Sequence, residues 1–496
     1  MYLGVKLDSS LTWTPHVTHL KKECYNRMKL IKHLSHTSWG ADAKSLTRLY
    51  QSLIKSKLEY GYEAYGSCSL TNLKKLEPAQ NTAMRIASGA FKTSPIKSLQ
   101  VITGLMPMEQ ARDLKMVKYI LRVAVNEKNP VHEIINSCGL FEADNAEEED
   151  NFFKTGFLRR AKIITGKFEV DLSTLAAEGP ANSPPWRISN LTVCNDMGGY
   201  TKSKVPPHIM KTIFQHHLGS YRDNLLLYTD GSKTQEGVAF SVTGGGSEYS
   251  YKLNRNASIF TAELNGIKEA ITRHLGTQKE TITILTDSKS SVQAISKIYS
   301  RHFIVQQIQE IIKSSSKSFA LCWVPSHTGV EGNERADTLA RAAIESADTL
   351  PHLMTRDDIF ASCKATPKKI WADSWRELQS NKLREITEHI STLPNASCRN
   401  RHWERTLARL RIGHTRLTHG YLMEGAEQPK CELCDADSNL TVKHLLIECS
   451  HWANQRILHF HRTYGLTIRQ LASTGRWRCH LRRSTLQVHP IYKPDE

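Results

Sequence analysis

The chain has 496 residues, of which 40% are hydrophobic and 23% are charged, a globular composition that excludes a wholly disordered chain, a collagen and a small disulfide scaffold. Lys and Arg outnumber Asp and Glu by 66 to 49, a formal net charge of +17. This balance favours a polyanionic partner, nucleic acid before an anionic membrane, although a solvated surface would also account for it.

The cysteines and the N-terminus indicate an intracellular protein. The 11 cysteines are scattered and include a single CxxC pair, which favours reduced thiols and one metal site over a disulfide framework. No run approaches the roughly 18 apolar residues of a membrane-spanning helix, and the first residues lack the basic and apolar regions of a signal peptide. We expect a location in the nucleus or the cytoplasm and no membrane partner.

Residues 1–140 are predicted to be mostly helical. Apolar residues recur every three or four positions along an early stripe that consists of Val17, Leu20, Cys24, Met28 and Ile31. Residues 141–222 are predicted to be a linker, because a run of acids between positions 142 and 150 is typical of a solvated segment. The prolines that follow, Pro206 and Pro207 among them, indicate loops.

Residues 223–346 change to alternating strands and helices, which predicts one sheet with helices against it. The expected strands are residues 225–229, 237–242, 249–253, 282–286 and 319–323. Ser258 is predicted to cap a helix, and another helix is expected to begin near Asn333.

Four acids and a histidine in this region are the candidate active site. Asp230 and Asp287 terminate predicted strands, and a turn is expected directly after Asp230. Glu263 and Asp337 lie on core-facing helical stripes, and His327 follows the last strand in a glycine-flanked loop. Each residue alone is more often a turn, surface or core residue; their order, spacing and element types together predict one cleft.

Four carboxylates in one cleft would repel one another strongly unless divalent cations neutralised them. Oxygen ligands suit Mg²⁺ or Mn²⁺. Two such ions roughly 3.5–4 Å apart serve in-line phosphodiester cleavage by activating the attacking water and stabilising the leaving oxygen. The histidine could move a proton near that leaving group.

The blocks YTDGS, TAEL, LTDSKS and WVPSHTGVEGNERAD, in this order, resemble the type 1 ribonuclease H domain over residues 223–346. The resemblance implies an α/β fold with a mixed five-stranded sheet flanked by helices and an RNA–DNA hybrid as substrate. It also implies the ligands of two Mg²⁺ or Mn²⁺ ions, which are Asp230, Glu263, Asp287 and Asp337, with His327 assisting proton transfer. Only residues 299–302 join the middle helices, where some members carry a basic insertion, so hybrid binding is expected from the basic flanks.

The N-terminal part resembles the region after the reverse transcriptase palm in non-LTR retrotransposon polyproteins of the I-type, LINE-like group. The resemblance rests on YLGVKLDSSLTW, LEYGYEAYGS, LEPAQNTAMRIASGAFKTSP and GLMPMEQARDLK. It implies a thumb-like helical region, in place of the plain helical packing module that the residues alone would suggest.

A polymerase active site is not expected in this chain. Reverse transcription needs a Y-x-D-D-type carboxylate pair, and the only adjacent aspartates are Asp357 and Asp358, which are predicted to be the first acids of a helix. We therefore expect no reverse transcriptase activity and interpret the chain as either a 5′-truncated element product or the product of a mis-bounded gene prediction. The alternative to a ribonuclease is a non-catalytic nucleic-acid-binding remnant.

A second metal site is predicted in residues 429–455, where the spacing Cys431-x2-Cys434-x9-His444-x4-Cys449 offers three thiolates and one imidazole. Such a set can bind Zn²⁺ tetrahedrally, and because it is closed the site would be structural. The spacing also resembles the C-terminal Cys/His motif of the same retrotransposon proteins. His451 is a competing ligand.

Residues 351–428 are predicted to be a helical, basic region, and residues 456–496 a basic tail. Tryptophans and arginines gather in the helical region, namely Trp371, Trp375, Trp403, Arg399, Arg401, Arg405, Arg409 and Arg411. They would stack on bases and neutralise phosphates, or they would form a helical core with solvated arginines. The tail is either a phosphate-binding arm or a disordered end.

Overall fold

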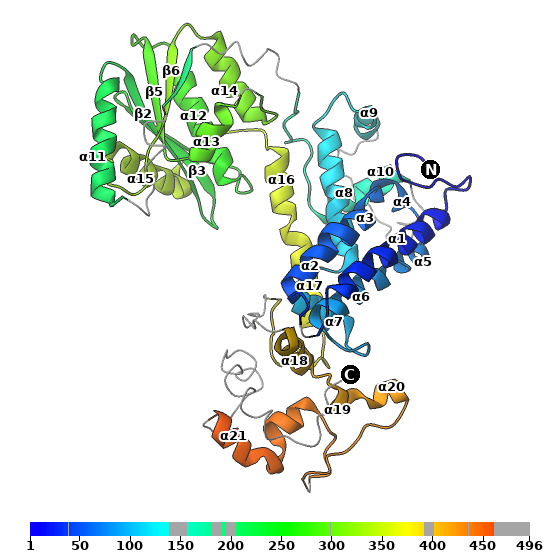
Figure 1. The fold of residues 1–496 in the computed structure, drawn as a ribbon. Helices are drawn as coiled ribbons and strands as arrows, with labels where there is room; N and C mark the ends of the chain where they lie inside the picture. The colour runs from blue at the N-terminus through cyan, green and yellow to red at the C-terminus, as the bar shows by residue number, and fades with distance from the viewer. Residues whose placement is uncertain are drawn as a thin grey trace. The chain divides into compact units, whose positions relative to one another are not determined.

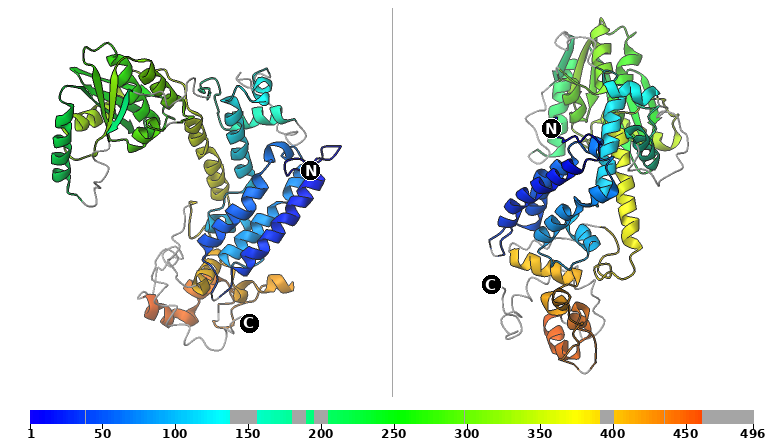
Figure 2. Two further views of the ribbon diagram at one scale, coloured as in Figure 1. Left: turned by 45° about the horizontal axis from the view of Figure 1, so that its top comes forward. Right: turned by 90° about the vertical axis from the view of Figure 1, so that its right-hand side faces the viewer.

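The computed structural model describes residues 1–37, 39–137, 156–179, 190–194, 205–297, 299–390, 401–434 and 436–460. The acidic run at 142–150, Arg399 and the tail beyond residue 460 lie outside these residues. The chain divides into two compact units, which Figures 1 and 2 show. Residues 117–147 and 161–365 form the sheet unit, and residues 1–116, 148–160 and 366–496 form the helical unit.

The sheet unit contains a mixed sheet of six strands in the order β1-β6-β5-β2-β3-β4. The strands are β1 (Leu191–Cys194), β2 (Leu225–Lys233), β3 (Val238–Gly244), β4 (Ser247–Leu253), β5 (Thr281–Thr286) and β6 (Ser318–Trp323). The first three strands of the predicted domain, β2 to β4, pair antiparallel, whereas β5, β6 and β1 add in parallel. An α/β fold with a mixed sheet is therefore confirmed.

The predicted number of five strands was wrong, because β1 adds a sixth strand from the expected linker. It pairs in register with β6, from Leu191 opposite Phe319 to Cys194 opposite Cys322. This pairing satisfies backbone groups of β6 that would otherwise form an open sheet edge. Four residues are too few for an alternating pattern to be recognised in the sequence.

Cys194 and Cys322 form a disulfide across β1 and β6. Their separation of 128 residues gave no signal in the sequence. The expectation that the thiols are reduced was wrong for this pair.

Helices cover both faces of the sheet. The helices of the sheet unit are α9 (Pro130–Ser137), α11 (Pro207–Leu218), α12 (Ile259–His274), α13 (Lys289–Ile295), α14 (Phe303–Ser314), α15 (Glu331–Ser346) and α16 (Arg356–Cys363). Apolar residues of α12, α13 and α14 pack with Leu227, Ile284 and Leu321 in one core. On the opposite face, α11 packs on Leu285 and Ala320.

The prediction that residues 206–218 form loops, which was based on Pro206 and Pro207, was wrong, because helix α11 lies there. Pro206 is the N-cap of α11 and Pro207 is its first residue, a position where the missing N–H of proline costs nothing. Met210 and Phe214, four residues apart, are the buried side chains of this helix. The two prolines therefore begin a helix that covers the sheet.

The helical unit begins with the predicted amphipathic helix. Its helices are α1 (Thr14–His33), α2 (Ala43–Tyr50), α3 (Ser56–Glu59), α4 (Tyr62–Tyr65), α5 (Leu70–Lys74), α6 (Glu77–Ser88), α7 (Ile96–Thr103), α8 (Met108–Ala124), α10 (Phe157–Lys167), α17 (Ala365–Arg376), α18 (Arg401–Ile412), α19 (Arg416–His419), α20 (Tyr421–Glu424) and α21 (Ala453–Phe460). Helices α8, α10 and α17 continue into the sheet unit. The stripe from Val17 to Ile31 is buried as predicted, and lysines lie exposed beside it at Lys21, Lys22, Lys29 and Lys32.

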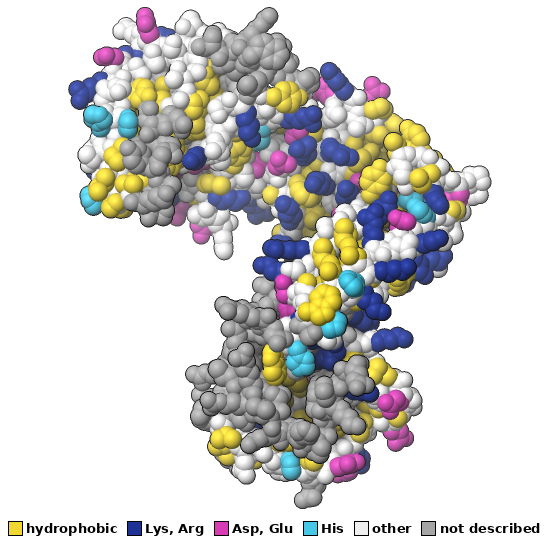
Figure 3. Space-filling view, in the orientation of Figure 1, with side chains coloured by type: hydrophobic (Ala, Val, Ile, Leu, Met, Phe, Trp, Pro, Cys, Tyr) yellow, Lys and Arg dark blue, Asp and Glu magenta, His cyan; other side chains and the backbone are white. Residues whose placement is uncertain are grey.

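The C-terminal helices complete the core of the helical unit. Trp371 and Trp375 are buried with Val101, and the Trp375 indole donates a hydrogen bond to the backbone of Thr387 at 3.2 Å. Of the two open interpretations of the tryptophans and arginines, the structure favours a helical core for these two tryptophans. Figure 3 shows Lys and Arg side chains gathered on the surface of the helical unit.

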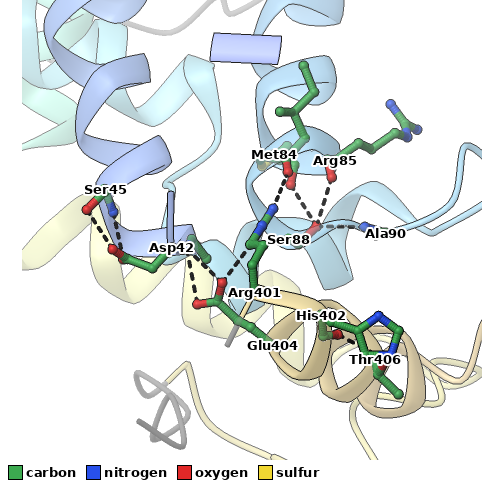
Figure 4. A network of polar contacts seen from close by, with 12 residues as sticks. Asp42, Ser45, Met84, Arg85, Ser88, Ala90, Arg401, His402, Glu404 and Thr406 are labelled. Atoms are coloured by element: carbon green, nitrogen blue, oxygen red, sulfur yellow. Dashed lines mark hydrogen bonds and ion pairs between the residues drawn. The ribbon is translucent and has the colours of Figure 1, made fainter. Parts of the chain in front are cut away.

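Arg401 and Glu404 of α18 join two other helix ends (Figure 4). The buried Arg401 guanidinium donates to the Ile86 carbonyl near the C-terminus of α6 at 2.7 Å and to Glu404 at 2.7 Å. Glu404 in turn accepts from the backbone N–H of Ala43 at the start of α2, at 2.9 Å. A cation at a helix C-terminus and an anion at an N-terminus both oppose the partial charges there. Arg401 is therefore neither a solvated arginine nor one free to bind phosphate.

None of the described helices has both the length and the apolar composition that are needed to cross a membrane.

Candidate active site

Asp230, Glu263 and Asp287 come together from three elements of the sheet unit. Asp230 lies within β2, opposite Ser241 of β3. Glu263 is on the second turn of α12, and Asp287 directly follows β5. Each offers a carboxylate oxygen within 4.8 Å of the others, so these three predicted residues do converge.

The turn predicted after Asp230 was wrong, because β2 continues through Gly231 to Lys233. Gly231 serves close packing instead: a Cβ at this position would lie 3.0 Å from the Glu263 backbone nitrogen and 3.1 Å from Ala262 Cβ. The missing side chain thus lets α12 approach β2 and brings Glu263 beside Asp230.

The first turn of α12 is held at its N-terminus. Ser258 accepts a hydrogen bond from the Thr261 backbone, the cap expected from the sequence. Asp358 of α16 accepts from the Ser258 N–H at 3.0 Å and from the Thr261 hydroxyl at 2.5 Å. Asp357 and Asp358 are thus the first acids of a helix, as predicted, and Asp358 also fixes the helix that carries Glu263.

The three acids have raised pKa values. Burial raises the pKa of Asp230 to about 8, with a further contribution from the negative charges of Asp287 and Asp337. Burial, then Asp230 and Asp287, raise the pKa of Glu263 well above its usual value. Burial also raises the pKa of Asp287, against hydrogen bonds that include one with Asn333. A divalent cation would oppose both the burial of these carboxylates and their mutual repulsion.

Asp337 lies beside this group and does not join it. Its carboxylate pairs with Arg341 one turn later on α15, at 2.9 Å, and it forms a second group with His327 and Glu334 within 4.8 Å. Its charge nevertheless raises the pKa values of Asp230 and Asp287, so it acts on the same site.

His327 lies exposed in the loop between β6 and α15, with a positive φ of 53°. The loop is fixed by Thr328, whose hydroxyl donates to the Pro325 carbonyl at 2.8 Å, and by Glu334, which accepts from the Gly329 N–H at 3.2 Å. Sequence reasoning missed Glu334 and Asn333. The spacing of Glu334 from Asp337, three residues on one helix, is the signal that could have indicated the former.

Cys431, Cys434, His444 and Cys449 form a separate group, as predicted, with ligand atoms within 4.8 Å of one another. Cys434 Sγ lies 3.4 Å from His444 Nε2, and the sulfurs of Cys431 and Cys449 lie 3.9 Å apart. The competing ligand His451 is not in the group. Three sulfurs and one imidazole nitrogen at these distances fit one tetrahedral ion.

Residues 222–345 match the RNase H family. Curated relatives are the probable RNA-directed DNA polymerases from transposon BS (29% identical over 84 residues) and transposon X-element (32% over 91 residues) of Drosophila melanogaster. A third is the RNA-directed DNA polymerase from mobile element jockey of Drosophila funebris, 30% identical over 89 residues. These matches cover 17–18% of this chain and only 9–10% of each relative. The expected resemblance to a non-LTR retrotransposon ribonuclease H region is confirmed.

Proposed function

We propose that the chain is an endoribonuclease that hydrolyses the RNA strand of RNA–DNA hybrids, because residues 222–345 match the RNase H family and part of the chain is similar to RNA-directed DNA polymerases of transposons. The observation that carries this proposal is the group of buried Asp230 and Glu263 with half-buried Asp287, whose oxygens lie within 4.8 Å of one another. The exposed lysines beside the buried stripe of α1 add a surface that suits a polyanion.

Asp230, Glu263 and Asp287, with Asp337 beside them, would hold two Mg²⁺ or Mn²⁺ ions. Such ions supply water activation and stabilisation of the negative charge that develops during phosphodiester cleavage. Arg341 Nε contacts Oδ1 of Asp337, and this carboxylate has a second oxygen that a metal ion could use. Separating the pair would also cost little, because it is 62% exposed on the Arg341 side and exposed ion pairs contribute little stability.

His327 is proposed to transfer a proton near the leaving oxygen. It is exposed and groups with Glu334 and Asp337 beside the three acids. The hydrogen bonds within its loop limit the positions that the imidazole can reach.

The second group, Cys431, Cys434, His444 and Cys449, is proposed to hold a structural Zn²⁺. Because all four positions would be protein ligands, no position is open for catalysis. The segment that holds these four residues would help to bind nucleic acid, together with the basic residues of the helical unit.

A labelled RNA–DNA hybrid tests the proposal. With Mg²⁺ the chain should cleave the RNA strand, and Asp230→Asn and Asp287→Asn should abolish cleavage but retain hybrid binding. The position of Asp337 outside the group of three acids is the observation that favours the alternative, a non-catalytic nucleic-acid-binding remnant. Wild-type binding without cleavage would establish that alternative, and primer extension by the chain would refute the expected lack of polymerase activity.

A further inference from the structure

One exposed lysine beside the three acids is held over an aromatic ring. Lys289 is the first residue of α13, two positions after Asp287. Its Nζ lies 5.6 Å from the centroid of the Trp323 ring, within the range of a cation–π contact. The ring therefore restricts a side chain that would otherwise be free in solvent.

The same indole also holds the backbone of the active site. Trp323 is the last residue of β6, and its Nε1 donates a hydrogen bond to the Asp287 carbonyl at 3.0 Å. Because Trp323 contacts both residues, the place of Lys289 is fixed relative to Asp287. The sequence LTDSKS thus places a positioned cation next to a metal-binding carboxylate.

Lys289 has no anionic partner in the part of the chain that the structure describes. None of the ion pairs found there includes it, although Asp287 is only two residues away. A cation–π contact does not neutralise the ammonium, which keeps its donors for another group. Among biological anions, a phosphate is well suited to a lysine, which acts on it as a point charge.

Resting on the ribonuclease function proposed above, we propose that Lys289 binds a backbone phosphate of the hybrid next to the cleaved bond, and that Trp323 is its positioning residue. The cleaved phosphate would lie at Asp287, and the Lys289 backbone N–H donates to the Asp287 carbonyl at 3.1 Å, so the two residues lie closer than the roughly 7 Å that two residues of extended chain would span. Holding the side chain in place before binding reduces the entropy lost on contact. Lys289 would thus fix where the strand lies on the acids.

The test measures kcat and KM for hybrid cleavage by the full chain with Lys289→Ala. Loss of one phosphate contact should raise KM about fivefold and leave kcat within about twofold. The slope of log KM against log salt should fall by about one. Lys289→Arg should restore both values, because arginine also stacks on an indole and binds phosphate.

The matched control is Lys279→Ala. Lys279 is exposed and precedes β5, so it lies at the opposite end of that strand from Asp287. The Lys279→Ala variant removes the same charge as Lys289→Ala and should leave KM and the slope of log KM against log salt unchanged. An equal effect of the two variants would overturn the proposal, because net charge alone would then explain it.

Trp323→Leu tests the positioning role. It should raise KM by the same factor as Lys289→Ala, and the double variant should raise KM no further. Additive effects would show that Trp323 does not act through Lys289. If Trp323→Leu does not fold, the exposed Lys289→Ala still decides the main claim: wild-type KM and salt slope would overturn it. No cleavage by the wild type would instead refute the ribonuclease proposal itself.

Discussion

The three-acid group and the Cys/His group are constructed in opposite ways. The acids come from β2, α12 and the end of β5, and the sheet that brings them together has its own large apolar core. The Cys/His residues lie within residues 431–449, and the buried apolar cluster found among the described residues there consists of Cys431, Leu440 and Cys449. If both groups bind metal as proposed, the acid site would need the fold before it binds metal, whereas the Cys/His segment would need metal to fold.

The largest expected effect concerns the acids. Asp287→Asn should lower the rate of hybrid cleavage by about 10³-fold or more, because it removes a ligand whose charge balances the cations. The sheet should remain folded, as circular dichroism would show. Asp357→Asn, at an acid that is 75% exposed, is the control. Residual cleavage above a tenth of the wild-type rate would contradict the assignment.

In the Cys/His group, loss of one ligand should instead unfold the surrounding segment. Cys431→Ser should lower zinc affinity by at least about 100-fold and expose the amides of residues 429–455 to hydrogen exchange. The amides of β2 and β5 should stay protected. His451→Ala serves as the control because His451 lies outside the group. Equal loss of zinc in both variants would make His451 a ligand.

His327 offers a finer test of the acid site. His327→Ala should lower kcat about 100-fold, the usual contribution of a proton-transferring group, with KM unchanged. His208→Ala, at an exposed histidine of α11, should have no effect. An unchanged kcat in His327→Ala would remove the proton-transfer role.

The smallest effect is a pH dependence of stability. The pKa of Asp230 rises from 3.8 to about 8 on folding, so the folded state binds more protons than the unfolded state between these values. Without divalent cations, stability should therefore fall as pH rises from 3.8 towards about 8. Asp230→Asn should flatten this trend and raise Tm at pH 8 by a few degrees. Melting curves in magnesium-free buffer measure it, and identical slopes for the two proteins would refute it.

The two groups also differ in how far the sequence revealed them. The proximity of the four Cys/His residues was predicted from their spacing, because a local group has its geometry encoded in nearby residues. Asp230, Glu263 and Asp287 were found from their order on strands and helices. That order did not reveal that Asp337 pairs with Arg341, because this depends on which way a half-exposed side chain turns.

The misread elements share a physical cause. Gly231 and Pro206–Pro207 were interpreted as turn and loop residues, since local preference is what a sequence displays. In the structure Gly231 admits a neighbouring helix, and the prolines begin α11. Likewise, Arg401 is buried because Ile86 and Glu404 accept its hydrogen bonds. These roles depend on tertiary contacts that no local pattern contains.

The contact between Glu404 and Ala43 has a consequence for the order of folding on the ribosome. The two residues are 361 positions apart, and the sheet unit is synthesised between them. At about 5–20 residues per second, the nascent N-terminal helices wait about 20–70 s for Glu404 to emerge. The sheet unit would complete its fold first, and the earliest helices would be the last to find their partner, exposed meanwhile to proteases and chaperones.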